Sequence, residues 1–246
     1  MSYPLKEFIN DRGKSTRVYF QNIATNPQLI ATDLMELINL DVRWEPRVDG
    51  FVSTPGECKG SAQNEGKETS VQRDIYRAKK ITLRGTPSCR VEWVDMEVPV
   101  DYKADTRRRT CPDLVGYAKN GKTYIVDLKY QRGEKDTTDN PIVGIYKTIY
   151  YALCAKKNGK NLRDYHIFHK KNGNYLNVNF LNGKPIYEEP IAVLVANNEY
   201  WEHWGSNLNN TNRSALIRIV NATIQDCGLT FQAYKFADYR AWSKIV

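Results

Sequence analysis

Apolar residues recur at the spacing of a helix in four stretches of the chain. The clearest stretch begins at Pro141, which suits a first helical turn after Asp139 or Asn140 as a cap, and it should end at Asn158-Gly159. The other three stretches cover residues 27–40, 67–80 and about 213–227. Since one side of each stretch collects the apolar side chains, each predicts a helix with one face in the core.

Strands are predicted where apolar and polar residues alternate, or where a short run is wholly apolar. The stretches with this pattern are residues 91–100, 111–118, 122–130, 164–170, 175–180 and 191–197. Turn residues join two pairs of them, Lys119-Asn120-Gly121 in one case and Asn172-Gly173 in the other. The order of helix, three strands, helix and further strands predicts an α/β fold, in which a central mixed β-sheet is flanked by helices.

Composition narrows the class of protein. The chain has 246 residues and a formal net charge of +8, and its apolar fraction of 41% is enough to build a core. No stretch approaches the ~20 apolar residues of a membrane span, and Lys6 and Glu7 interrupt the apolar run that a signal peptide needs. Five cysteines without a Cys-x-x-Cys pair favour reduced thiols. We therefore expect a cytoplasmic protein with no membrane partner, and the basic excess permits a polyanionic one.

The residues that carry chemistry lie on the first predicted hairpin. Asp127 and Lys129 are two positions apart on a strand, so their side chains share a face. A two-residue turn would place Asp113 away from Asp127. A three-residue loop with Gly121 in a left-handed bulge would set Asp113 across from Asp127 on the same face, and this is the loop that we predict.

Two carboxylates across a strand pair repel each other unless a cation lies between them. Oxygen ligands of this kind suit Mg²⁺, or Mn²⁺ in its place, and a neighbouring lysine can hold water and offset phosphoryl charge. The alternative interpretation is a plain ion pair between Asp127 and Lys129, with Asp113 opening a strand after Pro112.

The series Pro112-Asp113, thirteen residues, and Asp127-Leu128-Lys129 resembles the signature of the PD-(D/E)XK nuclease superfamily. The resemblance covers roughly residues 65–170, and it implies a restriction-endonuclease-like core with N- and C-terminal additions. It implies a single nuclease domain over 1–246, with a core of about 65–197 and flanking recognition or assembly elements at 1–64 and 198–246. By resemblance, Asp113 and Asp127 bind metal, the Leu128 carbonyl is a further ligand and Lys129 is the catalytic lysine.

Many members of this superfamily add a glutamate from the helix that precedes the sheet. Glu65 and Glu68 are the candidates. At 100° per residue, Glu68 lies within about 20° of Ile75 on the stripe that faces the core, which favours Glu68 as a fourth catalytic residue. A solvated or capping glutamate is the alternative.

Several further residues are candidates for contact with nucleic acid. Arg107, Arg108 and Arg109 precede Asp113 by a few residues, and Gln131 follows Lys129 on the same strand. Exonuclease-like members of the superfamily carry Gln-x-x-x-Tyr on the next helix. This chain has Lys147 and Tyr151 at that spacing, so lysine replaces glutamine.

The function predicted from these residues is a Mg²⁺-dependent DNA endonuclease of the type II restriction, repair, recombination or transposition type. Its partner would be double-stranded DNA, cut by a homodimer in the restriction case. Three alternatives stay open: a nucleic-acid-binding module of the same fold without catalysis, an RNA endonuclease of the cap-snatching type, and a structural or interaction protein in which the motif is a coincidence. Many cap-snatching enzymes use a histidine ahead of the hairpin, whereas His166, His169 and His203 all follow it here.

Overall fold

The computed structural model describes most of the chain. The residues it describes are 4–42, 51–53, 68–85, 87–98, 100–103, 108–133, 139–164, 166–171, 174–179, 186, 189–205, 208 and 210–245.

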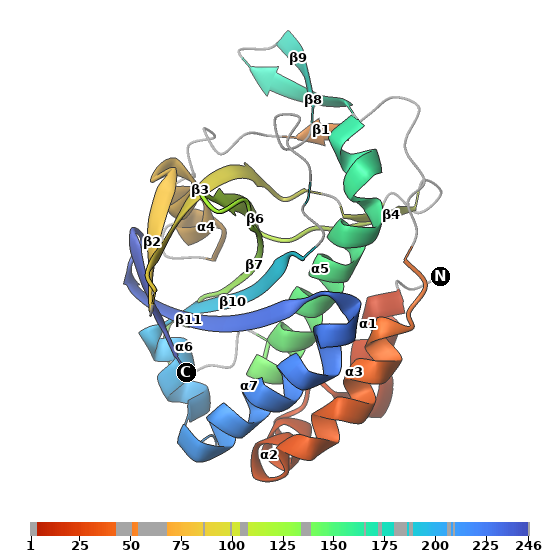
Figure 1. Ribbon diagram of the computed structural model, residues 1–246, viewed down its shortest axis with the longest axis vertical. Coiled ribbons are helices and arrows are strands. Elements are labelled where there is room, and N and C mark those ends of the chain that lie inside the picture. The colour runs from red at the N-terminus through yellow and green to blue at the C-terminus, as the bar shows by residue number, and fades with distance from the viewer. Residues whose placement is uncertain are drawn as a thin grey trace.

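The helices include three at the N-terminal end and four distributed among the strands (Figure 1). The first three are α1 (Pro4–Asn10), α2 (Arg17–Thr25) and α3 (Ile30–Ile38). The other four are α4 (Glu68–Arg77), α5 (Pro141–Asp164), α6 (Asn198–Gly205) and α7 (Asn210–Ile224). The predicted helices at 27–40, 67–80 and 213–227 correspond to α3, α4 and α7. The fourth, α5, continues past Asn158-Gly159 to Asp164. No helix of the described residues is long and apolar enough to cross a membrane.

Seven strands form a closed barrel in the order β10-β11-β12-β2-β3-β6-β7, with β7 paired to β10. Their bounds are β2 (Lys80–Arg84), β3 (Cys89–Met96), β6 (Leu114–Ala118), β7 (Thr123–Lys129), β10 (Ile191–Asn197), β11 (Thr230–Asp238) and β12 (Ala241–Lys244). The pairs β7–β10, β10–β11 and β12–β2 are parallel, and the other four pairs are antiparallel.

This closure shows that the predicted open central sheet, with a restriction-endonuclease-like core, is wrong. Strands β2, β3, β6, β7 and β10 alone would make an open mixed sheet with β2 and β10 at its edges. The C-terminal strands β11 and β12 pair with those two edges and join them. Closing the sheet in this way leaves no unpaired edge on it.

The strands outside the barrel form two small sheets. One consists of β1 (Phe51–Ser53), β8 (His166–Lys171) and β9 (Asn174–Asn179), and the other of β4 (Asp101–Lys103) and β5 (Arg108–Thr110). The antiparallel pair β8–β9 confirms the predicted second hairpin, since Lys171 pairs with Asn174.

The β6–β7 hairpin has the predicted bulged loop. The Gly121 N–H donates to the Ala118 carbonyl (3.0 Å), the Ala118 N–H donates to the Lys122 carbonyl (3.0 Å), and Gly121 has a φ of +84°. Leu114 pairs with Val126. Continued by one position, this register sets Asp113 opposite Asp127, so the predicted juxtaposition is confirmed.

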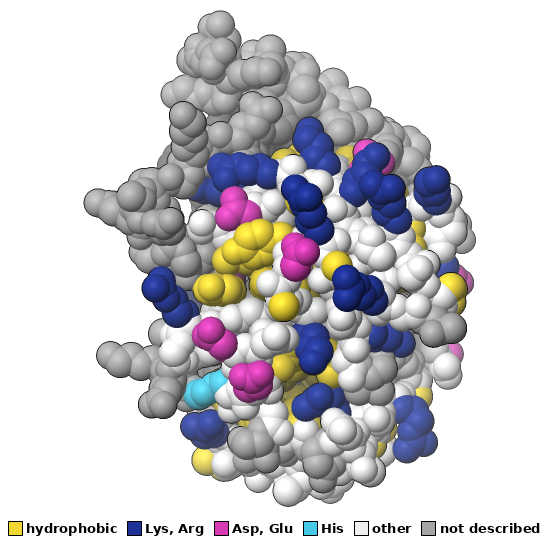
Figure 2. Space-filling model, turned by 90° about the vertical axis from the view of Figure 1, so that its left-hand side faces the viewer, with side chains coloured by type: hydrophobic (Ala, Val, Ile, Leu, Met, Phe, Trp, Pro, Cys, Tyr) yellow, Lys and Arg dark blue, Asp and Glu magenta, His cyan; other side chains and the backbone are white. Residues whose placement is uncertain are grey.

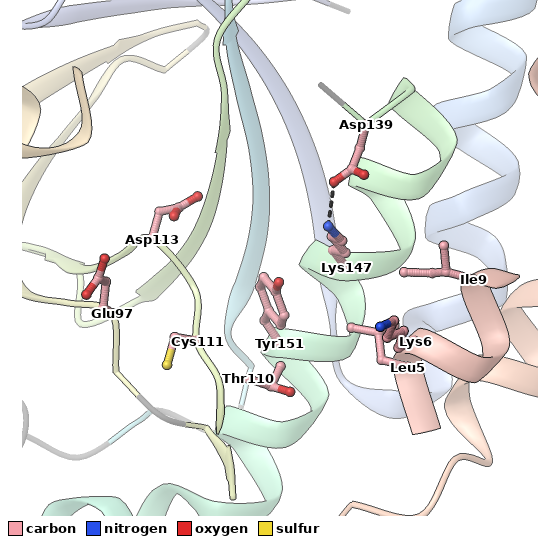
Figure 3. Close-up of a pocket in the computed structure, with 10 residues that line it drawn as sticks. All are labelled: Leu5, Lys6, Ile9, Glu97, Thr110, Cys111, Asp113, Asp139, Lys147 and Tyr151. Atoms are coloured by element: carbon pink, nitrogen blue, oxygen red, sulfur yellow. Dashed lines mark hydrogen bonds and ion pairs between the residues drawn. The ribbon is translucent and has the colours of Figure 1, made fainter. Parts of the chain in front are cut away.

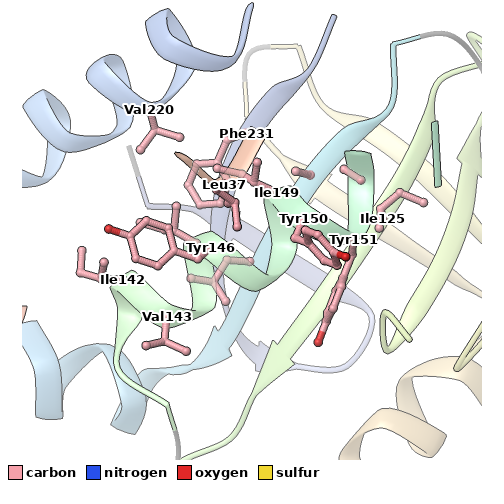
Figure 4. Packing of buried hydrophobic residues seen from close by; sticks show 14 of the residues in the cluster. Leu37, Ile125, Ile142, Val143, Tyr146, Ile149, Tyr150, Tyr151, Val220 and Phe231 are labelled. Atoms are coloured by element: carbon pink, nitrogen blue, oxygen red, sulfur yellow. The ribbon is translucent and has the colours of Figure 1, made fainter. Parts of the chain in front are cut away.

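Two apolar cores lie on opposite sides of the barrel wall. The inner core draws on all seven strands and on Val71 and Ile75 of α4, the helix that Figure 1 shows within the ring of strands. The outer core packs α5 against the outside of β7 and β10, and α3 and α7 pack beside α5 (Figure 4). Along β7, Val126 and Leu128 belong to the inner core and Ile125 to the outer one. Because side chains alternate along a strand, Asp127 and Lys129 share the outer side with Ile125 and face α5.

Candidate active site

The site is built around the end of β7, where both faces of the strand are buried. Asp127 is 3% exposed and Lys129 5% exposed, and Asp127 Oδ2 lies 2.8 Å from Lys129 Nζ. Despite this ion pair, Asp127 Oδ2 takes part in no hydrogen bond with the described residues. The Lys129 ammonium is therefore the partner of this oxygen through charge, and the pair is almost completely shielded from solvent.

Asp113 joins this pair from the neighbouring strand. Its Oδ2 accepts a hydrogen bond from the Leu128 N–H at 2.6 Å, across the β6–β7 pairing. Burial raises the pKa of Asp113 well above its ordinary value, and the negative charge of Asp127 raises it further, while Lys129 lowers it less. Asp113 and Asp127 are therefore close enough to repel, as the register predicts.

Glu68, at the start of α4, reaches the same place from inside the barrel wall. Its Oε2 accepts a hydrogen bond from the Tyr130 N–H (3.2 Å), one residue beyond Lys129. Burial raises the pKa of Glu68 and Lys129 lowers it, while Asp127 adds a further rise. The structure thus brings Glu68 into the cluster that the sequence predicted for it, whereas Glu65 lies outside the described residues.

Lys129 is the cation at the centre of these carboxylates. Its Nζ donates to the Leu128 carbonyl (3.2 Å) as well as pairing with Asp127. Burial alone would lower the pKa of Lys129, but Asp127, Glu68 and Asp113 outweigh it and hold the pKa well above its ordinary value. The side chain is therefore a permanent ammonium group at neutral pH.

A fourth carboxylate, Asp139, extends the cluster toward α5. Its Oδ2 lies 3.8 Å from Lys129 Nζ and accepts a hydrogen bond from Lys147. Burial would raise the pKa of Asp139, but Lys147 and Lys129 together lower it. The sequence offered Asp139 only as a possible cap, and Asn140 does the capping, since its Oδ1 accepts from the Ile142 and Val143 N–H groups (both 3.0 Å).

Two members of the cluster, Asp113 and Asp139, line a pocket of about 560 Å³ between β6 and α5 (Figure 3). Asp113 lines one side, and Asp139, Lys147 and Tyr151 line the other. Lys147 and Tyr151, predicted as contacts to nucleic acid, are thus brought to the site. The N-terminal helix α1 closes the pocket with Leu5, Lys6 and Ile9.

The other predicted contacts are not shown at the site. Gln131 is fully buried, and its Nε2 donates to the Gly133 carbonyl (2.8 Å). Its N–H donates to Asn197 Oδ1 (3.0 Å), so it ties β7 to the end of β10 and does not line the pocket. Arg107 lies outside the described residues, and Arg108 and Arg109 belong to β5, with side chains that the structure does not describe.

The residues can be tested for fit to Mg²⁺. Over the described ranges, no three or more His, Cys, Asp or Glu side chains converge as a ready set of metal ligands. Mg²⁺ needs fewer protein ligands, because it keeps several waters and uses one or two carboxylates together with substrate phosphate. Asp113 and Asp127 meet that smaller requirement. The Leu128 carbonyl, which the resemblance made a third ligand, accepts from Lys129 in this structure.

Comparisons with known proteins add no relative. No family model, no curated protein and no solved structure matches this chain. Any function assigned to the site therefore depends on its own residues.

Proposed function

We propose that this chain is a Mg²⁺-dependent nuclease that hydrolyses phosphodiester bonds in nucleic acid, with DNA as its substrate. The observation that carries the proposal is the gathering of Glu68, Asp113 and Asp127 around Lys129, beside a pocket that Asp113 lines. The order of these residues in the chain and the hairpin that holds two of them agree with the PD-(D/E)XK signature. The proposal concerns the chemistry of the site only. It does not assign the fold of the superfamily, because the closed barrel of this chain differs from that fold.

The surplus of negative charge favours a cation as ligand. Asp127, Glu68, Asp113 and Asp139 all act on Lys129, and Lys147 pairs with Asp139. Burial raises the pKa of Asp113 and of Glu68, so their ionised forms are disfavoured, and a divalent ion would stabilise these forms. Asp113 and Asp127 are the residues that would hold Mg²⁺. When bound, Mg²⁺ would supply Lewis-acid stabilisation of the phosphoryl oxygens.

The protein's own residues would do the rest. The Lys129 ammonium would donate hydrogen bonds to the attacking water and to a nonbridging phosphate oxygen, where negative charge develops in the transition state. Glu68 would orient the water from the α4 side. Lys147 and Tyr151 would contact the phosphate backbone from the wall of the pocket, since both line it.

The test is cleavage of supercoiled plasmid and of a single RNA transcript, each with Mg²⁺, Mn²⁺ or EDTA. We expect plasmid cutting that needs the metal and is lost in Asp127→Asn and Lys129→Ala. Binding without cutting under any metal would overturn the proposal in favour of a binding module, which the closed Asp127–Lys129 pair would then explain. Cutting of RNA alone would reject DNA as the substrate.

A further inference from the structure

A second pocket, of about 630 Å³, lies beyond the end of β7, on the side of the inner core, where Tyr130 and Phe236 line it. It begins at Tyr130, the residue that follows Lys129 and whose N–H donates to Glu68. Its other walls are the start of α6, at Asn198 and Glu199, and the end of β11, with Phe236 and Asp238. None of these groups is used by the nuclease proposal.

The lining of this pocket combines aromatic rings with carboxylates and an amide, and the rings are the groups on which a ligand could stack. Aromatic rings come from Tyr130, Phe236 and Tyr239, with the ring centroids of Phe236 and Tyr239 6.1 Å apart. Tyr239 is 37% exposed, the one aromatic residue among the large exposed hydrophobic side chains of the described residues. An exposed ring at the rim of a pocket offers a face on which a planar group can stack.

The polar groups of the lining suit the edge of a base better than a phosphate. Carboxylates come from Glu199 and Asp238, an amide comes from Asn198, and none of the described residues in the lining is Lys or Arg. Two carboxylates repel phosphate but accept hydrogen bonds from the amino group of cytosine, adenine or guanine. Asp238 Oδ1 is held by the Arg240 N–H (2.9 Å), which fixes this carboxylate at the rim.

Cationic groups lie just beyond this pocket. Asn198 also lines a third pocket of about 350 Å³, whose walls include Arg213, Lys235 and Lys244. Lys235 and Lys244 lie at the C-terminal end of the barrel, and Figure 2 shows Lys and Arg side chains spread over the face on that side of the molecule. If a nucleic-acid strand places a base in the second pocket, the phosphates of its neighbouring nucleotides would therefore lie close to these cationic side chains.

We infer that the second pocket binds an unpaired, amino-bearing nucleobase of the strand that is cut, stacked on Tyr239. The inference rests on the proposed function for the placement of the scissile phosphate at Lys129. Tyr130 packs against the inner core whereas Lys129 faces α5, but the Tyr130 N–H donates to Glu68 of the candidate site, so a nucleotide next to the cut would pass around this end of β7 to place its base in the pocket. The pocket would then select the strand position at which cutting occurs.

An abasic scan tests this inference without relying on cleavage. Single-stranded DNA oligonucleotides of deoxycytidine, each with one abasic nucleotide at a different position, are bound in EDTA and followed by fluorescence anisotropy. One position should weaken binding by the wild type about tenfold, as the loss of one stacked base does. Tyr239→Phe, which keeps the ring, should show the same loss at the same position.

Tyr239→Ala should bind the intact oligonucleotide about tenfold more weakly than the wild type does. An abasic nucleotide at the sensitive position should not lower the affinity of this variant further. Met35→Ala, an exposed residue of α3, is the control for nonspecific effects and should bind as the wild type does. A Tyr239→Ala variant with wild-type affinity overturns the inference even if the protein cuts DNA, and so does a protein that binds no oligonucleotide. If the protein cuts no DNA, and binding still weakens at one abasic position in a way that depends on Tyr239, the nuclease proposal is wrong and the base-binding pocket stands.

Discussion

Two clusters of charge, each with a buried lysine, can be compared in this molecule, and only one of them is balanced, in the sense that each of its carboxylates lies within ion-pair distance of a cation. The N-terminal charge cluster consists of the cations Arg12 and Lys14 and the carboxylates Asp11, Asp33 and Glu36, with the hydroxyls of Tyr19 and Tyr146. The candidate site cluster consists of Glu68, Asp113, Asp127, Asp139, Lys129 and Lys147.

In the N-terminal charge cluster each charged group has partners of the opposite kind. Asp33 accepts hydrogen bonds from the hydroxyls of Tyr19 and Tyr146, and its Oδ1 lies 3.8 Å from Arg12 and 3.9 Å from Lys14. Lys14 is fully buried, and its Nζ also donates to Asp11 and lies 4.4 Å from the centre of the Phe8 ring. Satisfied in this way, the cluster joins α1, α3 and α5, so its role is structural.

In the candidate site cluster the carboxyl groups outnumber the ammonium groups: the ion pairs involve Asp127 and Asp139, while burial raises the pKa of Asp113 and of Glu68. The contrast teaches that burial of a Lys–Asp pair is not by itself a sign of function. What separates the two clusters is the unbalanced charge at one of them, which is unfavourable for folding and is useful only when a ligand supplies positive charge.

The largest effect should come from removing the lysine of the unbalanced cluster. We expect Lys129→Ala to lower the rate of metal-dependent DNA cutting by about a hundredfold to a thousandfold, because a donor to the developing charge is lost. Lys119→Ala, at the far end of the same hairpin, is the matched control and should cut at the wild-type rate. Rates are measured by single-turnover plasmid cleavage, and equal loss in both variants would show that the effect is not local.

The next effect concerns the balanced cluster. We expect Asp33→Ala to lower the free energy of unfolding by about 3 kcal/mol, because Lys14 stays buried and two tyrosine hydroxyls lose their acceptor. Asp11→Ala should lower it by no more than about 1 kcal/mol, because the Asp11 side chain is 55% exposed. Urea denaturation gives both values. A lower cutting rate for folded Asp33→Ala would contradict the claim that the N-terminal charge cluster has only a structural role.

A smaller effect of opposite sign should appear at Asp113. We expect Asp113→Asn to raise the free energy of unfolding by about 1 kcal/mol at neutral pH in EDTA, because the repulsion from Asp127 is relieved while the amide oxygen can still accept from Leu128. Burial and Asp127 raise the pKa of Asp113, so the folded wild type loses stability as the pH rises through that raised pKa.

The stability gain of the Asp113→Asn variant should therefore shrink on acidification and vanish below the ordinary aspartate pKa of about 3.9. Urea denaturation at a series of pH values measures the difference between the two proteins. A variant that is less stable than the wild type at neutral pH would show that Asp113 is held for stability and not for a ligand.

Part of this picture could be predicted from the sequence. The hairpin register was predicted correctly by choosing a three-residue loop, with Gly121 in the left-handed position of a bulge, over a two-residue Asn120-Gly121 turn, since this choice fixes which side chains face each other. The helical stripe of α4 likewise predicted that Glu68 faces the sheet, and in the structure its Oε2 accepts from the Tyr130 N–H just beyond β7. Both inferences concern local periodicity, for which the sequence is a direct guide.

Closure of the barrel was missed because β11 does not alternate cleanly. Phe231 and Ala233 of this strand belong to the outer core, whereas Tyr234 and Phe236 belong to the inner one. Two neighbouring apolar residues, Ala233 and Tyr234, hide the period of two. Asp139 was missed for a different reason, since its approach to Lys129 depends on where the end of a loop meets β7 in space.

The central claim is that the unbalanced cluster binds a divalent cation, and it is tested most directly by titrating the protein with Mn²⁺ and measuring free Mn²⁺ by electron paramagnetic resonance. We expect the wild type to bind Mn²⁺, Asp33→Asn to bind it with the same affinity, and Asp127→Asn to lose that binding. No binding by the wild type at millimolar Mn²⁺, or undiminished binding by Asp127→Asn, would contradict the claim.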